Sequence, residues 1–298
     1  MSCAACKECL DKGQAASLPN GALRVALAGN PNCGKTTVFN AITGARQHVG
    51  NYPGVTVDRK EGSAKTSRGT EILLVDLPGA YSLTAYTQEE IVVRDVLAPS
   101  DKSQRPCAVI DVTEAGALER HLYLTVQMLE LGLPVVLLCN MADEARKAGM
   151  RIDYRLLSER LGLPVVEAVA RTGEGLSTTL DKAEELAKRY GLDGIEPLKI
   201  SYGQDLEPIL KEMTDFITAR NLLSRYPARW VALKLLERDE RIVEDLKEAS
   251  PSALNTLLAM QSQAAEHLKS VHKAEPEAVI ADSRYGYIHS VMQDVVVR

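Results

Sequence analysis

Several features that would assign the chain to a class at first sight are missing from the sequence. No continuous apolar run reaches the roughly 18 residues that a membrane-spanning helix needs, so we expect none of the 298 residues to cross a membrane. The opening stretch, MSCAACKECLDKGQ, has no apolar core, which argues against a secretory signal. Six cysteines are too few for a disulfide scaffold at this length, and a reducing, cytosolic compartment fits best.

An excess of positive charge is also missing. The chain carries 35 Lys and Arg against 40 Asp and Glu, which gives a formal net charge of −5 and an isoelectric point of about 5.7. Nucleic-acid-binding proteins usually show a basic surface, so we expect no nucleic acid as the main partner. What is present is an ordinary globular balance, 45% hydrophobic and 25% charged residues, in a length that suits one large or two smaller domains.

The segment from Leu23 to about residue 190 alternates short apolar runs with stretches of helical length. The runs are rich in Val, Ile and Leu and end near Gly, Asp or Asn, which is typical of a parallel sheet covered on both faces. We expect strands in LRVALAG, EILLVDLPG, CAVIDV, LPVVLLCN and LPVVEAVA. Helices are expected after the first of these and over Thr87–Ala98, Leu118–Leu131, Tyr154–Leu161 and Leu176–Tyr190.

Beyond about residue 200 the strand pattern ends, and apolar residues recur three or four positions apart. LEPILKEMTDFITAR, PARWVALKLLERDERIVEDL and PSALNTLLAMQSQAAEHLKSVHKA have the pattern of amphipathic helices, and Ser250 with Pro251 suits the start of the last. The predicted fold is therefore α/β with a mostly parallel sheet, followed by a small all-α domain. We place a cysteine-containing tail at 1–20, the α/β domain at 21–192, the helical domain at 193–290 and a linker at 291–298.

The residues from Gly29 to Thr36, GNPNCGKT, match the Walker A pattern and lie between a predicted strand and a predicted helix. The glycines let backbone N–H groups turn toward a β-phosphate, helped by the positive end of the following helix. Lys35 would neutralise β- and γ-phosphate oxygens, and the Thr36 hydroxyl would bind Mg²⁺. The expected nucleotide contacts here are Gly29, Asn30, Pro31, Asn32, Cys33, Gly34, Lys35, Thr36 and Thr37, with Cys33 filling a small-residue position.

Two stretches downstream fit the same phosphate site. VDLPG at 75–79 follows an apolar strand and offers Asp76 to Mg²⁺ and the N–H of Gly79 to a γ-phosphate. Between the two motifs lies VGNYPGVTVDRKEG, in which the Thr56 hydroxyl can close on the same metal when a γ-phosphate is present. Together with Gly54 and Val55, these residues complete the predicted triphosphate and magnesium site.

The stretch LPVVLLCNMAD ends a strand with Asn140 and Asp143 and predicts the base. A carboxylate at 143 can accept hydrogen bonds from N1–H and the 2-amino group of guanine, whereas adenine offers neither donor. A site built on such hydrogen bonds discriminates strongly. We therefore expect guanine, bound by Asn140, Met141 and Asp143, and GTP or GDP as the nucleotide.

Together these motifs resemble the TRAFAC GTPases. The combination of GNPNCGKTTVFN, VGNYPGVTV, DLPGAYSL, NMAD and ADSRYGYI further resembles the cytosolic N-terminal part of the FeoB family of bacterial ferrous iron transporters, over nearly the whole chain. The resemblance implies a Ras-like P-loop GTPase domain, a helical domain that modulates GDP release, and a transmembrane permease domain beyond residue 298.

The same resemblance implies a location and partners. The chain would be a soluble fragment at the cytoplasmic face of the bacterial inner membrane, beside its own permease domain. Small Feo accessory proteins and further copies of the chain, in a homo-oligomer, are the other partners it suggests. The implied activity is slow hydrolysis of GTP to GDP and phosphate.

One departure from the family pattern concerns the fifth guanine-site motif, which generally reads Ser-Ala before R-x-G-x-G. Here Val169 and Ala170 precede Arg171. The backbone N–H of Ala170 could still meet guanine O6, but a serine hydroxyl is missing, so we expect somewhat looser nucleotide binding.

A second departure is the N-terminal CAACKEC, which the common family pattern does not require. Cys3, Cys6 and Cys9 could supply three thiolates to zinc or iron. Structural zinc and iron–sulfur sites usually have four ligands, so free thiols in a flexible tail are the alternative.

Ala80 stands where Ras-like enzymes have the glutamine that orients the attacking water. In GTPases resembling this one, an asparagine at the position of Asn32 coordinates a potassium ion beside the β- and γ-phosphates, so we expect hydrolysis activated by K⁺. Carbonyl groups of Gly50, Asn51 and Tyr52 could complete the potassium shell. The expected catalytic residues are Asn32, Lys35, Thr56 and Gly79.

Two other functions stay open from the sequence. A soluble assembly GTPase acting on ribosome or tRNA can also carry an asparagine in this loop, but it predicts a basic surface or an RNA-binding appendage. A non-catalytic, nucleotide-gated interaction module would take Ala80 as a mark of lost hydrolysis. Phosphate release in K⁺ separates such a module from an enzyme.

Overall fold

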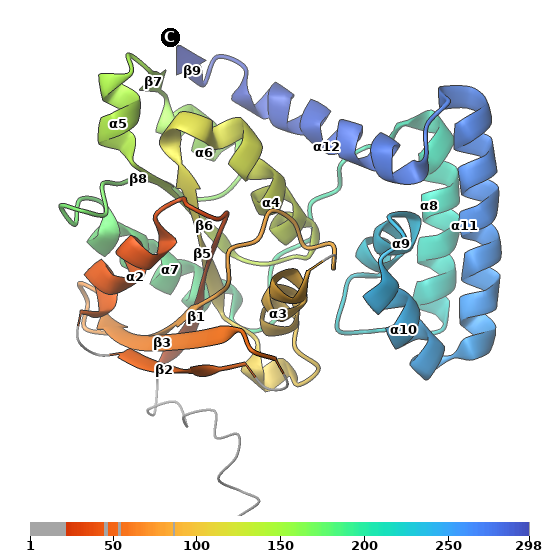
Figure 1. The fold of residues 1–298 in the computed structure, drawn as a ribbon, viewed down its shortest axis with the longest axis horizontal. Helices are drawn as coiled ribbons and strands as arrows, with labels where there is room; N and C mark the ends of the chain where they lie inside the picture. The colour runs from red at the N-terminus through yellow and green to blue at the C-terminus, as the bar shows by residue number, and fades with distance from the viewer. Residues whose placement is uncertain (1–21, 45–46, 53–54, 86, 298) are drawn as a thin grey trace, which may run out of the picture.

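A seven-stranded sheet forms the centre of the N-terminal part of the chain, in a computed structural model that describes residues 22–44, 47–52, 55–85 and 87–297 (Figure 1). The strand order is β2-β3-β4-β1-β5-β6-β8. The strands are β1 Leu23–Gly29, β2 Gln47–Asn51, β3 Asp58–Lys65, β4 Glu71–Asp76, β5 Ala108–Glu114, β6 Val135–Asn140 and β8 Val165–Glu167. From β4 to β8 all pairs are parallel, whereas β3 pairs antiparallel with both β2 and β4.

The parallel strands are the apolar runs that the sequence singled out, and the predicted fold class is confirmed. Strands β1, β5 and β6 are buried over almost their whole length, as strands covered on both faces must be. The sequence did not predict β2 or β3. Both are polar, and most side chains of β2 are exposed, so backbone pairing at the edge of the sheet holds them without an apolar pattern.

Helices cover both faces of this sheet. The side chains of Val25 and Leu27 point to the face of α2 (Lys35–Thr43) and α7 (Leu176–Tyr190), and form one core with Phe39. Ala26 and Ala28 point to the opposite face, where α3 (Gln88–Leu97) and α4 (Leu118–Glu130) pack. Two short helices, α5 (Ala142–Lys147) and α6 (Tyr154–Leu161), and the 3-10 turns η1 (Lys102–Gln104) and η2 (Ala115–Ala117) complete this domain.

The C-terminal part is helical, as predicted, but has more helices than the pattern indicated. They are α8 Gly203–Ala219, α9 Ala228–Leu236, α10 Glu240–Ala249, α11 Pro251–His272 and α12 Pro276–Met292. The segment expected as one helix from residue 227 breaks because Arg238 adopts a positive φ of 57° and the Asp239 side chain caps α10 at Ile242 N–H. Ser250 caps α11 as the sequence predicted.

Helix α12 returns from the helical part to the α/β domain, along the upper side of the molecule in Figure 1. On the way Arg284 is fully buried and donates to Glu130 of α4 at 2.9 Å and to Glu237 at 2.5 Å. Beyond it, β9 (Val296–Val297) pairs antiparallel with β7 (Arg151–Ile152). The segment that we expected to begin a linker is thus paired with the α/β domain up to Val297. No described helix is both long enough and apolar enough to span a bilayer.

One buried carboxyl makes the stability of this fold depend on pH. Asp111 of β5 is fully buried, accepts a hydrogen bond from the Thr125 hydroxyl at 2.6 Å, and has its Oδ1 unpartnered among the described residues. Burial raises the pKa of Asp111 to about 7. In the unfolded chain the pKa of an aspartate carboxyl is about 3.9. The folded protein therefore holds this proton more tightly, and stability falls as pH rises from the unfolded toward the folded pKa.

Asp111→Asn should remove this pH-dependent loss of folding stability, because an amide keeps an acceptor for Thr125 and does not ionise. Between pH 5 and pH 8 the parent should lose on the order of 2 kcal/mol more unfolding free energy than the variant. Urea unfolding at both pH values measures it. The exposed Asp282→Asn should follow the parent, and equal pH profiles for parent and Asp111→Asn would contradict the assignment.

Candidate functional site

The Walker A residues form a tight turn between β1 and α2, and both of its glycines are sterically required. A Cβ on Gly29 (φ 150°) would approach the carbonyl oxygen of Val112 to 2.4 Å. A Cβ on Gly34 (φ 85°) would lie 2.3 Å from Asn140 Nδ2. Asn32 has a positive φ of 67° and an exposed side chain. The loop backbone therefore lies close to Val112 and Asn140, and the Asn32 side chain stays at the surface.

Lys35 and Asp76 meet directly. The Lys35 Nζ lies 2.6 Å from Asp76 Oδ1, and both side chains are largely shielded from solvent. Thr36 and Thr37, which follow, are exposed residues. A hydroxyl and one carboxylate are oxygen ligands of the kind that Mg²⁺ takes alongside phosphate oxygens and water. Across the described ranges no group of three or more His, Cys, Asp or Glu is arranged to hold a metal by itself.

The DLPG segment is joined to the end of β1 and the first residue of the phosphate loop by backbone hydrogen bonds. Leu77 N–H donates to the Leu27 carbonyl at 3.0 Å, and Ala80 N–H donates to the Gly29 carbonyl at 3.3 Å. A Cβ on Gly79 would lie 3.1 Å from the Pro31 ring, so glycine suits this close approach. Ala80 is 2% exposed. Its methyl group is buried in the core, and this position presents no side chain to a water near the phosphates.

Asn140 joins the phosphate loop to the loop after β8. It is 3% exposed; its Nδ2 donates to the Cys33 carbonyl at 3.0 Å, and its Oδ1 accepts from Ala170 N–H at 3.0 Å. The N–H that the sequence assigned to guanine O6 is thus directed at Asn140 here. Met141, the next residue, takes the left-handed conformation (φ 59°) and is the N-cap residue directly before α5.

Asp143 lies at the first turn of α5, with its carboxylate facing two cations. Arg171 Nη2 lies 3.0 Å and Lys147 Nζ 3.5 Å from Asp143 Oδ2. Desolvation raises the pKa of Asp143, but the hydrogen bond from Arg171 and the charges of both cations outweigh it and hold the pKa below its ordinary value. The carboxylate is therefore ionised. A small cavity of about 90 Å³ adjoins it, lined by Gly34, Thr37, Asn140, Met141, Asp143, Glu144, Val169, Ala170 and Arg171.

Among the described residues, no side-chain hydrogen bond or ion pair joins Gly50, Asn51, Val55 or Thr56 to the phosphate loop. Thr56 and Asn51 are exposed, and Val55 is half-buried. Gly50 and Asn51 pair with β3 in the sheet, opposite Arg59 and Asp58. Gly54 and the three N-terminal cysteines, Cys3, Cys6 and Cys9, lie outside the described residues.

Tyr52 has a role that the sequence did not reveal. The sequence pointed to its carbonyl group, but its side chain turns inward and its hydroxyl donates to the backbone carbonyl of Asp76 at 3.1 Å. A tyrosine in a polar loop carries no signal for such a bond, because the partner is a backbone atom of another motif. Cys33, beneath the loop, is fully buried, and burial raises the pKa of its thiol to about 12, as expected for a residue that only fills space.

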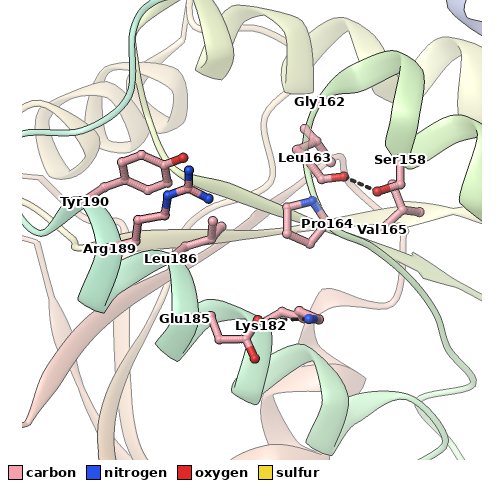
Figure 2. A pocket seen from close by; sticks show the side chains of 10 residues that line it. All are labelled: Ser158, Gly162, Leu163, Pro164, Val165, Lys182, Glu185, Leu186, Arg189 and Tyr190. Atoms are coloured by element: carbon pink, nitrogen blue, oxygen red, sulfur yellow. Dashed lines mark hydrogen bonds and ion pairs between the residues drawn. The ribbon is translucent and has the colours of Figure 1, made fainter.

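A larger cavity, of about 470 Å³, is lined by none of these residues (Figure 2). It sits between α7 and the segment leading into β8, and Lys182, Arg189 and Tyr190 are among its lining residues. Lys182 pairs with Glu185 at 2.9 Å, and the Ser158 hydroxyl donates to the Leu163 carbonyl at 2.6 Å. Most of its polar groups already bond to one another, so size alone does not make it the functional site.

Comparison with known proteins now decides the family. A family model described as "Ferrous iron transport protein B" matches residues 23–183, and one described as "FeoB cytosolic helical domain" matches residues 202–297. The chain belongs to the FeoB family. The matches divide it where the fold does, into the α/β domain and the helical domain, and they leave the soluble assembly GTPase without support.

Relatives with curated descriptions are much longer than this FeoB chain. An "Fe(2+) transport protein A/Fe(2+) transporter FeoB fusion protein" of Porphyromonas gingivalis is 42% identical over 281 residues, 93% of this chain and 32% of the relative. An "Fe(2+) transporter FeoB" of Staphylococcus aureus is 36% identical over 272 residues, 91% of this chain and 38% of the relative. The chain thus spans about a third of their length.

Solved FeoB structures share the fold. A mutant of S. thermophilus NFeoB bound to GDP has a TM-score of 0.79 at 33% identity and covers 92% of this chain and 100% of its own. The cytosolic domain of T. maritima FeoB in its GMPPNP form has a TM-score of 0.76 at 33% identity, with coverage of 93% and 100%.

Asn140→Ala should destabilise this FeoB chain strongly, because it leaves the Cys33 carbonyl and Ala170 N–H buried without partners. Each unpaired group costs about 1–3 kcal/mol, so we expect a loss of about 2 kcal/mol or more. Urea unfolding without nucleotide measures the loss. Asn255→Ala, on the exposed side of α11, should change stability little; a similarly small loss for Asn140→Ala would show that the amide does not hold the two loops together.

Proposed function

We propose that this chain binds GTP and Mg²⁺, hydrolyses GTP slowly to GDP and phosphate, and thereby regulates an Fe²⁺ transporter of which it is the cytoplasmic part. The carrying observation is that the loop of Lys35, the carboxylate of Asp76 and the Asn140–Asp143 motif meet at one edge of the sheet. FeoB structures in GDP and GMPPNP forms support the nucleotide, and relatives named Fe(2+) transporters support the process.

Lys35 and Asp76 would take two arrangements, one paired with each other and one bound to phosphate and Mg²⁺. In the described arrangement the ammonium neutralises Asp76. Phosphate oxygens would compete for Lys35, and the freed carboxylate would then join Thr36, and Thr56 from the loop before β3, as a ligand for Mg²⁺. The Gly79 N–H would meet the γ-phosphate. Mg²⁺ held there supplies positive charge against the β- and γ-oxygens.

Asn32 is the residue to which we assign potassium activation. Its amide is exposed on a strained loop position, and the buried methyl of Ala80 provides no substitute for a water-orienting side chain. A monovalent cation held by the Asn32 oxygen, with carbonyl groups of Gly50 to Tyr52, would stabilise charge that develops between the β- and γ-phosphates.

The helical domain holds the segment that follows Gly79. Lys234 of α9 donates to the Thr84 hydroxyl at 2.9 Å, and Asp239 accepts from Ala85 N–H at 3.1 Å. Asp239 also pairs with Arg94 of α3 at 2.7 Å, with both side chains fully buried. A buried pair of this kind is costly to break. Movement at Gly79 on nucleotide exchange would therefore strain the contacts of residues 84, 85 and 94 with the helical domain. We propose that the helical domain modulates GDP release through these contacts.

The proposed location is the cytoplasmic face of the bacterial inner membrane, next to the permease domain of the full-length protein. In the P. gingivalis relative a transport protein A and FeoB share one chain, which supports small Feo accessory proteins as partners. A homo-oligomer also belongs to this proposal.

Base choice is tested at Asp143. Asp143→Asn should weaken GDP binding at least about tenfold, because charge-assisted hydrogen bonds worth about 1.5–3 kcal/mol are lost. The same variant should gain affinity for xanthosine diphosphate, which presents a carbonyl where guanine has its amino group. Calorimetric titration of both nucleotides measures the switch, with the exposed Glu159→Gln of α6 as control. Unchanged GDP affinity in Asp143→Asn would refute the assignment of the base site.

Hydrolysis is tested by GTP turnover in KCl and NaCl at equal ionic strength. The parent should be roughly 10–100-fold faster in KCl, a smaller gain than an arginine finger gives. Asn32→Ala should lose the response to K⁺ but still bind GTP through Lys35, Thr36 and the loop N–H groups. Asn255→Ala should behave as the parent. Equal parent rates in the two salts, or a response that survives Asn32→Ala, would refute potassium activation; no turnover in either salt would favour the non-catalytic module.

A further inference from the structure

A second cavity, of about 360 Å³, lies behind the nucleotide site, between α3 and the face of the sheet that α3 covers. Its volume falls within the range of small-molecule sites, about 300–1,000 Å³. Val75 of β4 and Val92 and Val96 of α3 form apolar walls. None of the residues assigned to phosphate, magnesium or base lines it. Tyr52, whose carbonyl group we assigned to potassium, lines it with its side chain.

Two charged side chains on this cavity have unsatisfied atoms. Arg24 of β1 is only 8% exposed, and its Nε has no hydrogen-bond partner among the described residues. Asp95 of α3, on the same cavity, has a buried Oδ1 that is likewise unpartnered there. Arg59 differs, because it is paired with Glu61 at 2.5 Å. Buried charged groups are normally paired. A bound molecule could pair them by offering an acceptor to Arg24 and a donor to Asp95.

The chemistry of such a partner follows from these two groups. A guanidinium binds a carboxylate or phosphate by paired N–H donors. The Asp95 carboxylate disfavours a doubly charged phosphate in the same cavity and requires a hydrogen-bond donor. The apolar walls require an apolar body between the two ends. A small carboxylate with a hydroxyl or amino group at its far end meets all three conditions.

Tyr52 connects this cavity to the magnesium ligand. Its side chain lines the cavity, and its hydroxyl holds the Asp76 carbonyl at 3.1 Å, while the Asp76 carboxylate pairs with Lys35. Arg59 covers the Tyr52 ring, with its guanidinium carbon 5.9 Å from the ring centroid. An occupant that packs against Tyr52 favours its inward position, and with it the Lys35–Asp76 pair that competes with nucleotide phosphates.

We propose that the cavity between α3 and the sheet binds a small, apolar-bodied carboxylate that bears a hydrogen-bond donor, through Arg24 and Asp95, and that its occupancy opposes nucleotide binding through Tyr52. The site itself stands independently of the proposed GTPase function; only the coupling rests on it.

Direct binding tests the site with 6-hydroxy-2-naphthoate as a fluorescent probe, titrated into the nucleotide-free chain. We expect saturable binding that Arg24→Met weakens at least about tenfold, the equivalent of one charge-assisted hydrogen bond. The neutral 6-hydroxy-2-naphthamide should bind at least about tenfold more weakly than the acid for the same reason. Arg155→Met, which removes a largely exposed arginine of α6, should bind the probe as the parent does.

Two further variants test the cavity without removing Arg24 and test whether Asp95 recognises the hydroxyl group of the probe. Val96→Trp keeps Arg24 but fills the cavity, and should abolish binding. Asp95→Leu should remove the preference for 6-hydroxy-2-naphthoate over 2-naphthoate. Binding that survives Arg24→Met and Val96→Trp, equal binding of acid and amide, or no saturable binding to the parent would overturn the site.

The coupling is tested by repeating the titration with GDP and Mg²⁺ present. Linkage requires that, if the probe opposes nucleotide, nucleotide opposes the probe by the same factor. We expect weaker probe binding in the parent, and no difference in Tyr52→Phe, which lacks the hydroxyl that holds Asp76. Equal affinities in the parent would overturn the coupling, provided that a separate titration shows GDP bound; absence of GDP binding would instead refute the proposed function.

Discussion

The amide of Asn140 is the interaction on which the arrangement of the site depends. Its two ends reach the Cys33 carbonyl and Ala170 N–H, which belong to loops 107 and 30 residues away in sequence. Both partners are backbone groups, so the bond fixes loop positions whatever side chains the loops carry. Asp143 follows three residues later, so the spacing between the phosphate loop and the carboxylate to which we assign guanine recognition is set by one buried side chain.

Charge buried between the two domains has a different effect. Arg284 joins Glu130 of the α/β domain to Glu237 of the helical domain, and Arg94 joins α3 to Asp239. Apolar packing tolerates sliding, whereas buried ion pairs lose much of their energy when either partner is displaced. The two domains therefore have one strongly preferred relative position, and a change in the segment after Gly79 must either keep these pairs or break them together.

Much of the α/β domain could be predicted from the sequence because its central strands are buried on both faces and must be apolar throughout. The polar edge strands β2 and β3 could not be predicted, since strands held by backbone pairing do not require an apolar side-chain pattern. The break between α9 and α10 rests on the positive φ of Arg238, which has no sequence signal, although Asp239 is an ordinary N-cap residue that could have indicated a helix start. The motifs predicted a set of site residues, but not the Lys35–Asp76 and Arg171–Asp143 pairs, because those pairs depend on how separate loops meet in space.

The short ribbon of β7 and β9 gives the molecule a mechanical connection between distant parts of the chain. Val296 and Val297 are hydrogen-bonded beside Ile152 and Arg151, a few residues after the helix that begins next to Asp143. Arg160 adds a hydrogen bond to the Val291 carbonyl at 3.1 Å. A force applied at residue 297 would act on this ribbon, and so on the part of the α/β domain that also carries Asp143. The pairing of β9 therefore ties the end of the helical part to the region of α5 and Asp143 through the backbone of β7.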